Sequence, residues 1–495
     1  MVASLIKIIY SGAEDARLGV TKEPYIRLKR YITNLLSERQ GRATTQWVRL
    51  DFISSPEFGR KSSIILPRKG HFIRRLFLVT TLPDLDEDRR KSIRAVTPQF
   101  GYTNSIGHAL IDEAVLTIGG VKIDTLNSRL LEVLDEAHTP LEKIPTINKL
   151  IGRYGSSIGD GIPAQQLHIP LPFWFCNDNP AYALPIDSIA VDEVRLEFTL
   201  RSLVNLYYTR SRTIDGSLYP LDFPTYYAYN DVSGQLYPNL YIPPIGEDPE
   251  QYTRLLYKAE NSNGRSIDSY KLGDTYIMAE YVYVDSPEAN RFRLADLEIP
   301  ITQYTINEPV TSQGRSEIQI PLRIGNPVKA IRFYGQLGGS EQLNAYFLAT
   351  RELSAVNQYG PSPQLWWPDT GAFNEYDIQS GFSNVNSEIF SRMELKYHGT
   401  LIRYTTDSPV HFRTYLPLIY GDAKTAWHNR YYYTLPFGDS CANYDKMERV
   451  QLELGLKPVR GKLSTAFVPP VITVYLFAET VNILRIFGGR AGLLF

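Results

Sequence analysis

Apolar and polar side chains alternate in many short runs along the chain. Clear examples are Thr45–Phe52, Ala114–Ile118, Val194–Phe198 and Val450–Leu454. A period of two places successive side chains on opposite faces of a strand, so that one face packs and the other meets solvent or a second sheet. Strands of parallel α/β sheets instead form nearly continuous apolar runs. The pattern therefore predicts an all-β protein built from antiparallel sheets.

Helical patterns are few. The strongest is Asn127–Glu136, in which Asn127 can cap the helix and the leucines at positions 130, 131 and 134 fall at helical spacing. A second short helix is predicted over Asp285–Phe292, with Pro287 early in its first turn. We therefore expect a few short helices between the strands.

Five sequence landmarks recur in the same order in the two halves of the chain. They are Ser63–Pro67 and Phe72–Val79 against Glu317–Pro321 and Val328–Tyr334, Val115–Ile123 against Met393–Ile402, Ile169–Phe175 against Thr414–Tyr420, Glu193–Phe198 against Arg449–Leu454, and Tyr276–Val284 against Val471–Ala478. The second pair reads as a hairpin with a glycine-containing turn in both copies. Five landmarks in register indicate two copies of one β domain, each with two sheets of roughly four strands packed face to face.

The repeat predicts the domain organisation. We expect an N-terminal arm (1–39), a first β domain (40–286) with an inserted segment (204–272), a linker (287–296), a second β domain (297–488) and a C-terminal tail (489–495). The inserted segment is dense in Tyr, Pro, Gly, Ser and Asn, which is typical of a long surface excursion that packs on itself. Its tyrosines favour contact with a neighbouring subunit.

Charge and composition exclude several roles. The chain has 52 basic and 53 acidic residues and a net charge of −1, which disfavours direct binding to nucleic acid. No stretch approaches the roughly 20 apolar residues of a membrane-spanning helix, so no transmembrane segment is expected. The two cysteines, Cys176 and Cys441, lie far apart in sequence and fit a reducing compartment.

No catalytic, cofactor-binding or metal-binding residues are predicted. Ser157 lies in a Gly-x-Ser-x-Gly pattern, but Gly161 and Pro163 prevent the helix that a nucleophile elbow needs. Gly455–Lys462 only superficially resembles a phosphate loop, because its spacing is one residue too long. The remaining candidates are solvated carboxylate pairs and isolated histidines: Glu14–Asp15, Asp86–Asp88, His71, His108, His138, His168, His398, His411 and His428. We therefore expect a protein that is not an enzyme.

Several longer motifs resemble one known family. They are Ser11–Asp15, Gly107–Gly120, Ile169–Cys176 with Ala183–Pro185, and Val481–Gly489, and they span nearly the whole chain. In these segments the chain is similar to the double jelly-roll major capsid proteins of the nucleocytoplasmic large DNA viruses. The resemblance implies an all-β fold of two tandem eight-stranded antiparallel jelly rolls.

The resemblance also implies a function and partners. It implies a homotrimer whose six similar barrels form a pseudo-hexagonal capsomer, with neighbouring capsomers tiling an icosahedral shell in the virion. It further implies minor capsid proteins as partners on the inner face, and assembly in the host cytoplasm. The alternatives are a minor capsid or scaffolding protein of the same fold and, from other classes, a carbohydrate-binding β-sandwich module or a carbohydrate-processing enzyme.

Overall fold

The structure is a computed structural model. It describes residues 43–85, 100–103, 105–153, 165–176, 182–209, 211–212, 218–219, 270–337, 346–347, 349, 388–397, 401–406, 408–420, 431–437, 441–444, 447, 449–457, 459–460, 467–468 and 471–494. The predicted arm (1–39) and most of the predicted insertion (204–272) lie outside these residues.

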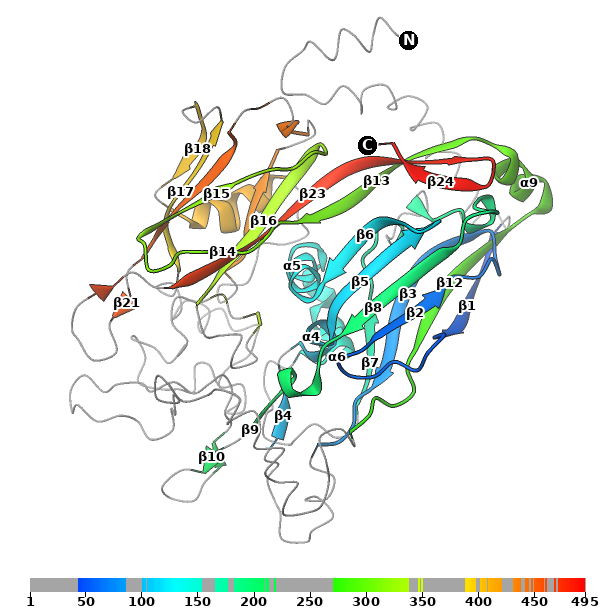
Figure 1. The fold of residues 1–495 in the computed structure, drawn as a ribbon, viewed down its shortest axis with the longest axis horizontal. Helices are drawn as coiled ribbons and strands as arrows, with labels where there is room; N and C mark the ends of the chain where they lie inside the picture. Colours follow the sequence, from blue (N-terminus) through cyan, green and yellow to red (C-terminus); the bar gives the residue numbers. More distant parts are fainter. Residues whose placement is uncertain are drawn as a thin grey trace, which may run out of the picture.

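The first half of the chain forms two antiparallel four-stranded sheets (Figure 1). One has the order β1 (Ala43–Asp51), β12 (Tyr276–Val284), β3 (Phe72–Thr81) and β7 (Gln166–Pro170). The other has the order β2 (Lys61–Ile65), β8 (Val194–Leu200), β5 (Ile111–Ile118) and β6 (Val121–Asn127). Each sheet thus joins strands that are distant in sequence, which is the strand order of a jelly roll.

The second half repeats this topology. Its first sheet has the order β13 (Leu297–Ile306), β23 (Ile472–Phe487), β16 (Val328–Leu337) and β19 (Tyr433–Pro436), with β14 (Val310–Thr311) and β24 (Arg490–Leu493) also paired to β23. Its second sheet has the order β15 (Glu317–Pro321), β20 (Gln451–Leu456), β17 (Phe390–Tyr397) and β18 (Leu401–Thr406). The fold is therefore two tandem eight-stranded jelly rolls, as the resemblance implied.

Helices and short strands connect these sheets. The α-helices are α4 (Ile106–Leu110), α5 (Ser128–His138), α6 (Ile144–Ile151), α9 (Ser286–Leu294) and α11 (Leu416–Tyr420); η2 (Leu141–Lys143), η4 (Ile186–Ser188) and η5 (Leu203–Asn205) are 3₁₀ turns, and η11 (His411–Tyr415) is a π-turn. The short strands are β4 (Phe100–Tyr102), β9 (Tyr207–Thr209), β10 (Ser211–Arg212), β11 (Leu218–Tyr219), β21 (Val459–Arg460) and β22 (Phe467–Val468). Among the described helices, none is long and apolar enough to cross a membrane.

Both predicted helices are confirmed. Asn127 caps α5, and its Oδ1 accepts a hydrogen bond from the Leu130 amide at 2.8 Å. Helix α9 carries Pro287 in its first turn and occupies most of the predicted linker between the two jelly rolls. The hairpin predicted over Val115–Ile123 is also confirmed, because Gly119 and Gly120 have φ values of 57° and 82°, which suit a two-residue turn.

Two sequence predictions are wrong. The segment Thr414–Tyr420 is helical, and the strand equivalent to β7 is β19, which occupies the same edge position in its sheet. The proposed equivalence of Ile169–Phe175 and Thr414–Tyr420 is therefore wrong, because a short Pro-containing apolar run fits a buried helix as well as an extended segment. Residues 489–495 are not a free tail, because Arg490–Leu493 forms β24 and pairs with β23 across a glycine turn.

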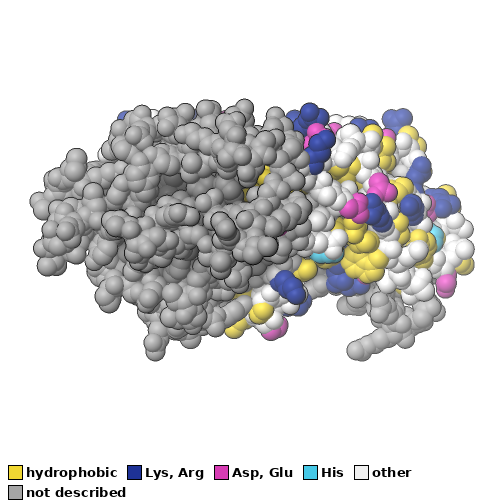
Figure 2. Space-filling view, turned by 90° about the horizontal axis from the view of Figure 1, so that it is seen from below, with side chains coloured by type: hydrophobic (Ala, Val, Ile, Leu, Met, Phe, Trp, Pro, Cys, Tyr) yellow, Lys and Arg dark blue, Asp and Glu magenta, His cyan; other side chains and the backbone are white. Residues whose placement is uncertain are grey.

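The alternating pattern explains the core. Along β5 and β8, Ala114, Leu116, Leu196 and Phe198 are almost completely buried, and the residues between them are more exposed. The described surface of the first jelly roll carries hydrophobic, basic and acidic side chains in mixture (Figure 2).

Candidate functional site: the interface between the two jelly rolls

Helix α5 of the first jelly roll lies against the β13–β23–β16 sheet of the second (Figure 1). This contact fixes the two jelly rolls relative to each other. The helix begins directly after edge strand β6, with its N-terminus fixed by the Asn127 cap. The end of β6 therefore sets where α5 can lie.

A buried polar cluster holds α5 on its own jelly roll. Arg153 contacts Glu132 at 2.7 Å and Asp135 at 2.6 Å, and both carboxylates lie on α5. His108 Nδ1 lies 2.7 Å from the same Glu132 carboxylate. Burial by itself would lower the pKa of Arg153, but the surrounding carboxylates outweigh it and raise that pKa. A buried cation with two anionic partners is costly to disrupt, which makes the helix a rigid platform.

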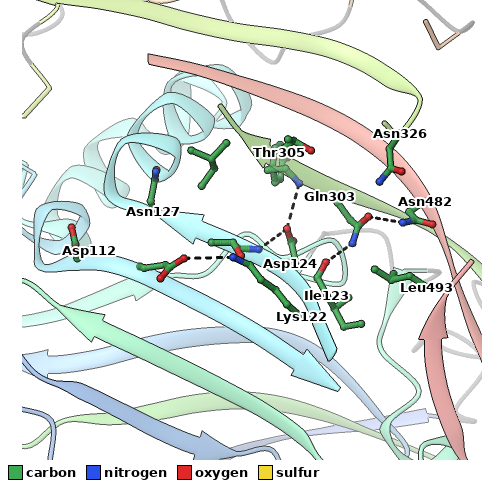
Figure 3. Close-up of a pocket in the computed structure, with 14 residues that line it drawn as sticks. Asp112, Lys122, Ile123, Asp124, Asn127, Gln303, Thr305, Asn326, Asn482 and Leu493 are labelled. Atoms are coloured by element: carbon green, nitrogen blue, oxygen red, sulfur yellow. Dashed lines mark hydrogen bonds and ion pairs between the residues drawn. The ribbon is translucent and has the colours of Figure 1, made fainter. Parts of the chain in front are cut away.

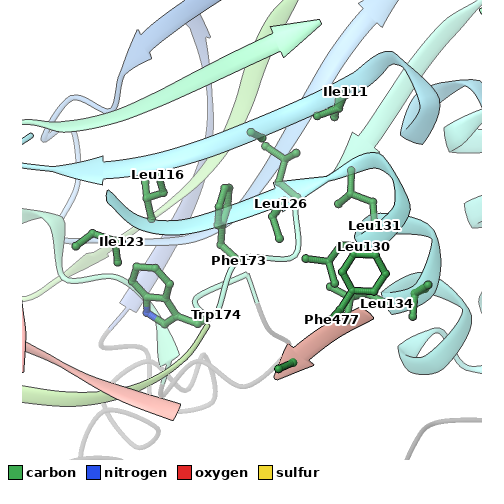
Figure 4. Packing of buried hydrophobic residues seen from close by; sticks show 14 of the residues in the cluster. Ile111, Leu116, Ile123, Leu126, Leu130, Leu131, Leu134, Phe173, Trp174 and Phe477 are labelled. Carbon is green, nitrogen blue, oxygen red and sulfur yellow. The ribbon is translucent and has the colours of Figure 1, made fainter. Parts of the chain in front are cut away.

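The apolar contact is made by the leucines of α5 and by Phe477 of β23. Leu130, Leu131 and Leu134 are buried, and Phe477, only 2% exposed, belongs to the same hydrophobic cluster and lies near them (Figure 4). Phe477 points away from its own barrel, because Leu476 and Ala478 take the inner face of the strand. Its burial therefore depends on the first jelly roll.

Polar side chains surround this apolar contact. The Arg129 guanidinium lies 4.0 Å from the centroid of the Tyr475 ring and donates to Gln336 at 3.2 Å. At the other end of α5, the His138 ring nitrogen lies 3.2 Å from Arg332. Cation–π contacts of this kind contribute about 1–2 kcal/mol when they are removed from water. Both ends of the helix are thus attached to the second jelly roll.

Arg332 is paired with Glu479 on the covered face of the second sheet. The two charged groups are 2.5 Å apart, and both side chains are about 95% buried. Lys329 contacts the other oxygen of Glu479 at 2.7 Å. Burial by itself would raise the pKa of Glu479, but the positive charges of Arg332 and Lys329 dominate and lower it to about 2. Glu479 is therefore ionised at any physiological pH.

Strand β6 and strand β13 form a second contact. Gln303 donates to the Ile123 carbonyl and accepts from Asn482, and the Tyr304 amide donates to Asp124 at 3.3 Å. Next to these bonds lies a groove of about 680 Å³ between the two jelly rolls (Figure 3). The groove has a mixed polar and apolar lining. Among the described residues, no cluster of three His, Cys, Asp or Glu side chains could hold a metal ion.

Asp124 is the unusual residue of this contact. Its side chain is 3% exposed, and Oδ1 accepts hydrogen bonds from the Thr125 and Tyr304 amides. Burial raises the pKa of Asp124 to about 7, because the two amides and Lys122 only partly offset the loss of hydration. The folded protein therefore binds a proton here more tightly than the unfolded chain does.

The C-terminal hairpin makes a third contact. The Gly489 carbonyl accepts a hydrogen bond from the Val191 amide at 2.8 Å, and the Ala491 amide donates to Asp192 at 2.9 Å. Gly489 has a φ of 79°, and a Cβ there would lie 3.2 Å from the Ala190 side chain. A glycine is thus required both by the turn and by the close approach of the first jelly roll.

The structure keeps the histidines apart, within the residues that it describes. His71 accepts a hydrogen bond from the Val284 amide, and His411 stacks on Tyr415. His108 contacts Glu132, and His138 contacts Arg332. Cys441 is buried and Cys176 is half-buried, and neither forms a disulfide bond within the described residues. The segments around Glu14, Asp86 and Ser157, together with His398 and His428, lie outside the described residues.

The sequence reasoning missed the residues that join the two jelly rolls. Arg129, Gln303, Arg332 and Glu479 carry no motif, and their partners are far away in sequence. One signal was available in the repeat. Glu280 in β12 corresponds to Glu479 in β23, because each follows an alanine and the two strands hold the same position in their sheets. A charged residue repeated inside a strand that is otherwise apolar indicates a paired site.

Comparison with known proteins identifies similar sequences. Residues 38–229 match the family model described as the N-terminus of major capsid proteins. The major capsid proteins of Frog virus 3 and Rana tigrina ranavirus are 21% and 25% identical to the chain over 363 residues, which cover 71% of this chain and 70% of each relative. Probable capsid protein 4 of Acanthamoeba polyphaga mimivirus is 25% identical over 233 residues, and the match covers 44% of that relative. The chain thus spans less than half of that mimivirus protein.

Solved structures give the same result for the fold. A subunit of the PBCV-1 virus capsid superposes with a TM-score of 0.62 at 16% identity, covering 92% of this chain and 97% of that chain. The Faustovirus major capsid protein superposes with a TM-score of 0.57 at 10% identity, covering 96% of this chain and 100% of that chain. Strand order and superposition together define a double jelly-roll protein.

The sequence matches narrow this class further. Combined with the repeated topology, they show that the chain is similar to the major capsid proteins of large DNA viruses. The role of this family is structural and not enzymatic.

Proposed function

We propose that this protein is the major capsid protein of a large DNA virus, and that it forms homotrimeric, pseudo-hexagonal capsomers that tile an icosahedral shell. The observation that carries the proposal is the buried interface between two jelly rolls of identical topology. Two similar barrels at a fixed angle let three chains close into a ring of six, because a repeated head-to-tail contact generates a closed ring.

The partners follow from the same arrangement. Neighbouring capsomers would meet along the outer edges of the ring, and minor capsid proteins would bind the inner face. We propose that the protein assembles in the host cytoplasm and resides in the virion shell. Neither cysteine forms a disulfide bond within the described residues, which is consistent with a reducing compartment.

Native mass spectrometry and negative-stain microscopy of the purified protein test the proposal. The expected result is a particle of three times 56.3 kDa with a six-lobed outline. A stable monomer at micromolar concentration would refute the trimer. The abundance of the chain in purified virions separates a major capsid protein from a minor capsid or scaffolding protein of the same fold.

A further inference from the structure

The two jelly rolls present equivalent sheet faces, of which only one is covered by a helix among the residues that the structure describes. In the second jelly roll, this face carries Tyr334, Gln336 and Phe477, all at most 2% exposed, beneath α5 and its surroundings. In the first jelly roll, the equivalent face is the side of the β1–β12–β3 sheet that points away from its core. One chain thus supplies a covering helix for one of two equivalent faces.

The face of the first jelly roll that lacks this cover is apolar at its centre. Trp47 of β1 is 46% exposed, and its ring lies 5.8 Å from that of Phe77 on β3. Met278 of β12 pairs directly with Phe77 and is also only half-buried. Directly paired residues of an antiparallel sheet share a face, so Trp47, Phe77 and Met278 form one continuous patch. We call it the Trp47 face.

The equivalence of the two faces extends to a charged pair. Arg75 of β3 and Glu280 of β12 form an ion pair at 3.4 Å on the Trp47 face, as Arg332 and Glu479 do at 2.5 Å on the covered face. Glu280 is 6% exposed, and its partner Arg75 is 33% exposed, whereas both members of the second pair are about 95% buried. The Trp47 face therefore resembles the covered face in composition, but no described helix lies on it as α5 lies on the second jelly roll.

The second jelly roll has a helical segment that corresponds to α5. Residues 410–420 follow β18 as α5 follows β6, and they form one continuous helical segment through η11 and α11. Phe412 and Leu416 pack into their own jelly roll, whereas Val410, Tyr415, Leu418 and Ile419 are 38%, 52%, 74% and 52% exposed. Residues 415, 418 and 419 fall at i, i+3 and i+4 spacing, which gives the helical segment an apolar outer stripe.

We propose that the helical segment 410–420 of one subunit packs on the Trp47 face of the next subunit, and so repeats between chains the contact that α5 makes within the chain. The partner is a second copy of this protein, and the inference rests on the proposed trimeric function. Three such contacts alternate with three internal ones around the ring, so that all six barrels of the trimer use one kind of interface. Leu418 and Ile419 would play the part of the α5 leucines, with Met278 and Trp47 beneath them.

Substitution on the helical segment tests the contact. The double variant Leu418→Asp/Ile419→Asp places two carboxylates in the interface, whereas Ile53→Asp makes the same change at a 61% exposed side chain outside both surfaces. The trimer of the double variant should dissociate at a protein concentration at least about a hundredfold higher than that of the wild type, because an unpaired buried charge costs several kcal/mol. The Ile53→Asp control should dissociate like the wild type. Circular dichroism and the thermal transition of the monomer report whether each variant is folded.

A photo-crosslinking amino acid at position 418 locates the receiving surface directly. Irradiation of the full-length trimer, followed by peptide mass spectrometry, should link position 418 to residues 43–51, 72–81 or 276–284 of another subunit. Crosslinks elsewhere, or a folded double variant that dissociates like the wild type, would overturn this interface while leaving the trimer intact. A monomeric wild-type protein would instead refute the proposed function itself.

Discussion

Replacing Glu479 with glutamine should destabilise the folded protein by about 3 kcal/mol at pH 7. The first estimate comes from the shift of the Glu479 pKa from 4.5 to about 2, which corresponds to about 3 kcal/mol of favourable interaction with Arg332 and Lys329. The second comes from the partner, because a buried cation that loses its anion typically costs about 3–5 kcal/mol. The side chain is only 4% exposed, so solvent screening reduces neither estimate much.

The pH dependence of this effect has a definite sign. The folded-state pKa of Glu479 is lowered, so its contribution is fully present above pH 4.5 and is lost as the pH falls towards 2. The difference between wild type and Glu479→Gln should therefore be constant near neutral pH, shrink below pH 4.5 and close near pH 2. Urea unfolding of both proteins at several pH values, followed by tryptophan fluorescence and circular dichroism, measures this difference.

A matched control separates the buried pair from an ordinary surface pair. Glu298 lies in the same sheet, 3.8 Å from Arg485, and both side chains are about half exposed. Glu298→Gln should change the free energy of unfolding by less than about 0.5 kcal/mol, because exposed pairs contribute little. Adding Arg332→Met to Glu479→Gln should recover much of the loss by removing the unpaired charge. An equal small effect of Glu479→Gln and Glu298→Gln would refute the reasoning.

Three further perturbations probe the same interface. Asp124→Asn should stabilise the protein at pH 8 by up to about 4 kcal/mol and have little effect near pH 4. Burial raises the pKa of Asp124 to about 7, so the stability contributed by the protonated side chain is lost as the pH rises through that value. Urea unfolding at the two pH values measures this, and a variant that is never more stable than the wild type would contradict it. Gly489→Ala should cost about 1–2 kcal/mol from its positive φ, with additional crowding against Ala190, whereas Gly492→Ala, which has open space, should be nearly neutral in thermal unfolding. Asn127→Ala should cost about 1 kcal/mol through loss of the α5 cap, and an unchanged midpoint of urea unfolding would show that the cap is dispensable.

The strands and their duplication could be predicted from the sequence, because both depend on local patterns. Alternation along Val194–Phe198 and the glycine turn at 119–120 each specify one local geometry, and both appear in the structure. The helical segment 410–420 could not be distinguished from a strand, because its apolar residues face both its own barrel and the outside. A helix with two apolar sides loses the periodicity by which helices are recognised.

The contacts between the two jelly rolls could not be predicted from local pattern. Gln303 and Ile123 are 180 positions apart, and the pairing of Arg332 with Glu479 depends on which strands become neighbours in the sheet. A single polar residue in a strand is compatible with solvent exposure as well as with burial beside a partner. Only the three-dimensional arrangement decides between these two environments.

Strand β23 has a consequence for how a curved shell can form. Its 16 residues extend about 50 Å, from the sheet contacted by α5 to the hairpin that bonds to the loop at Val191. Bending one barrel against the other would therefore have to break contacts at two well-separated points at once. A subunit braced in this way would keep the same internal angle throughout the proposed shell. The curvature of that shell would then arise between molecules, where the proposed trimers meet.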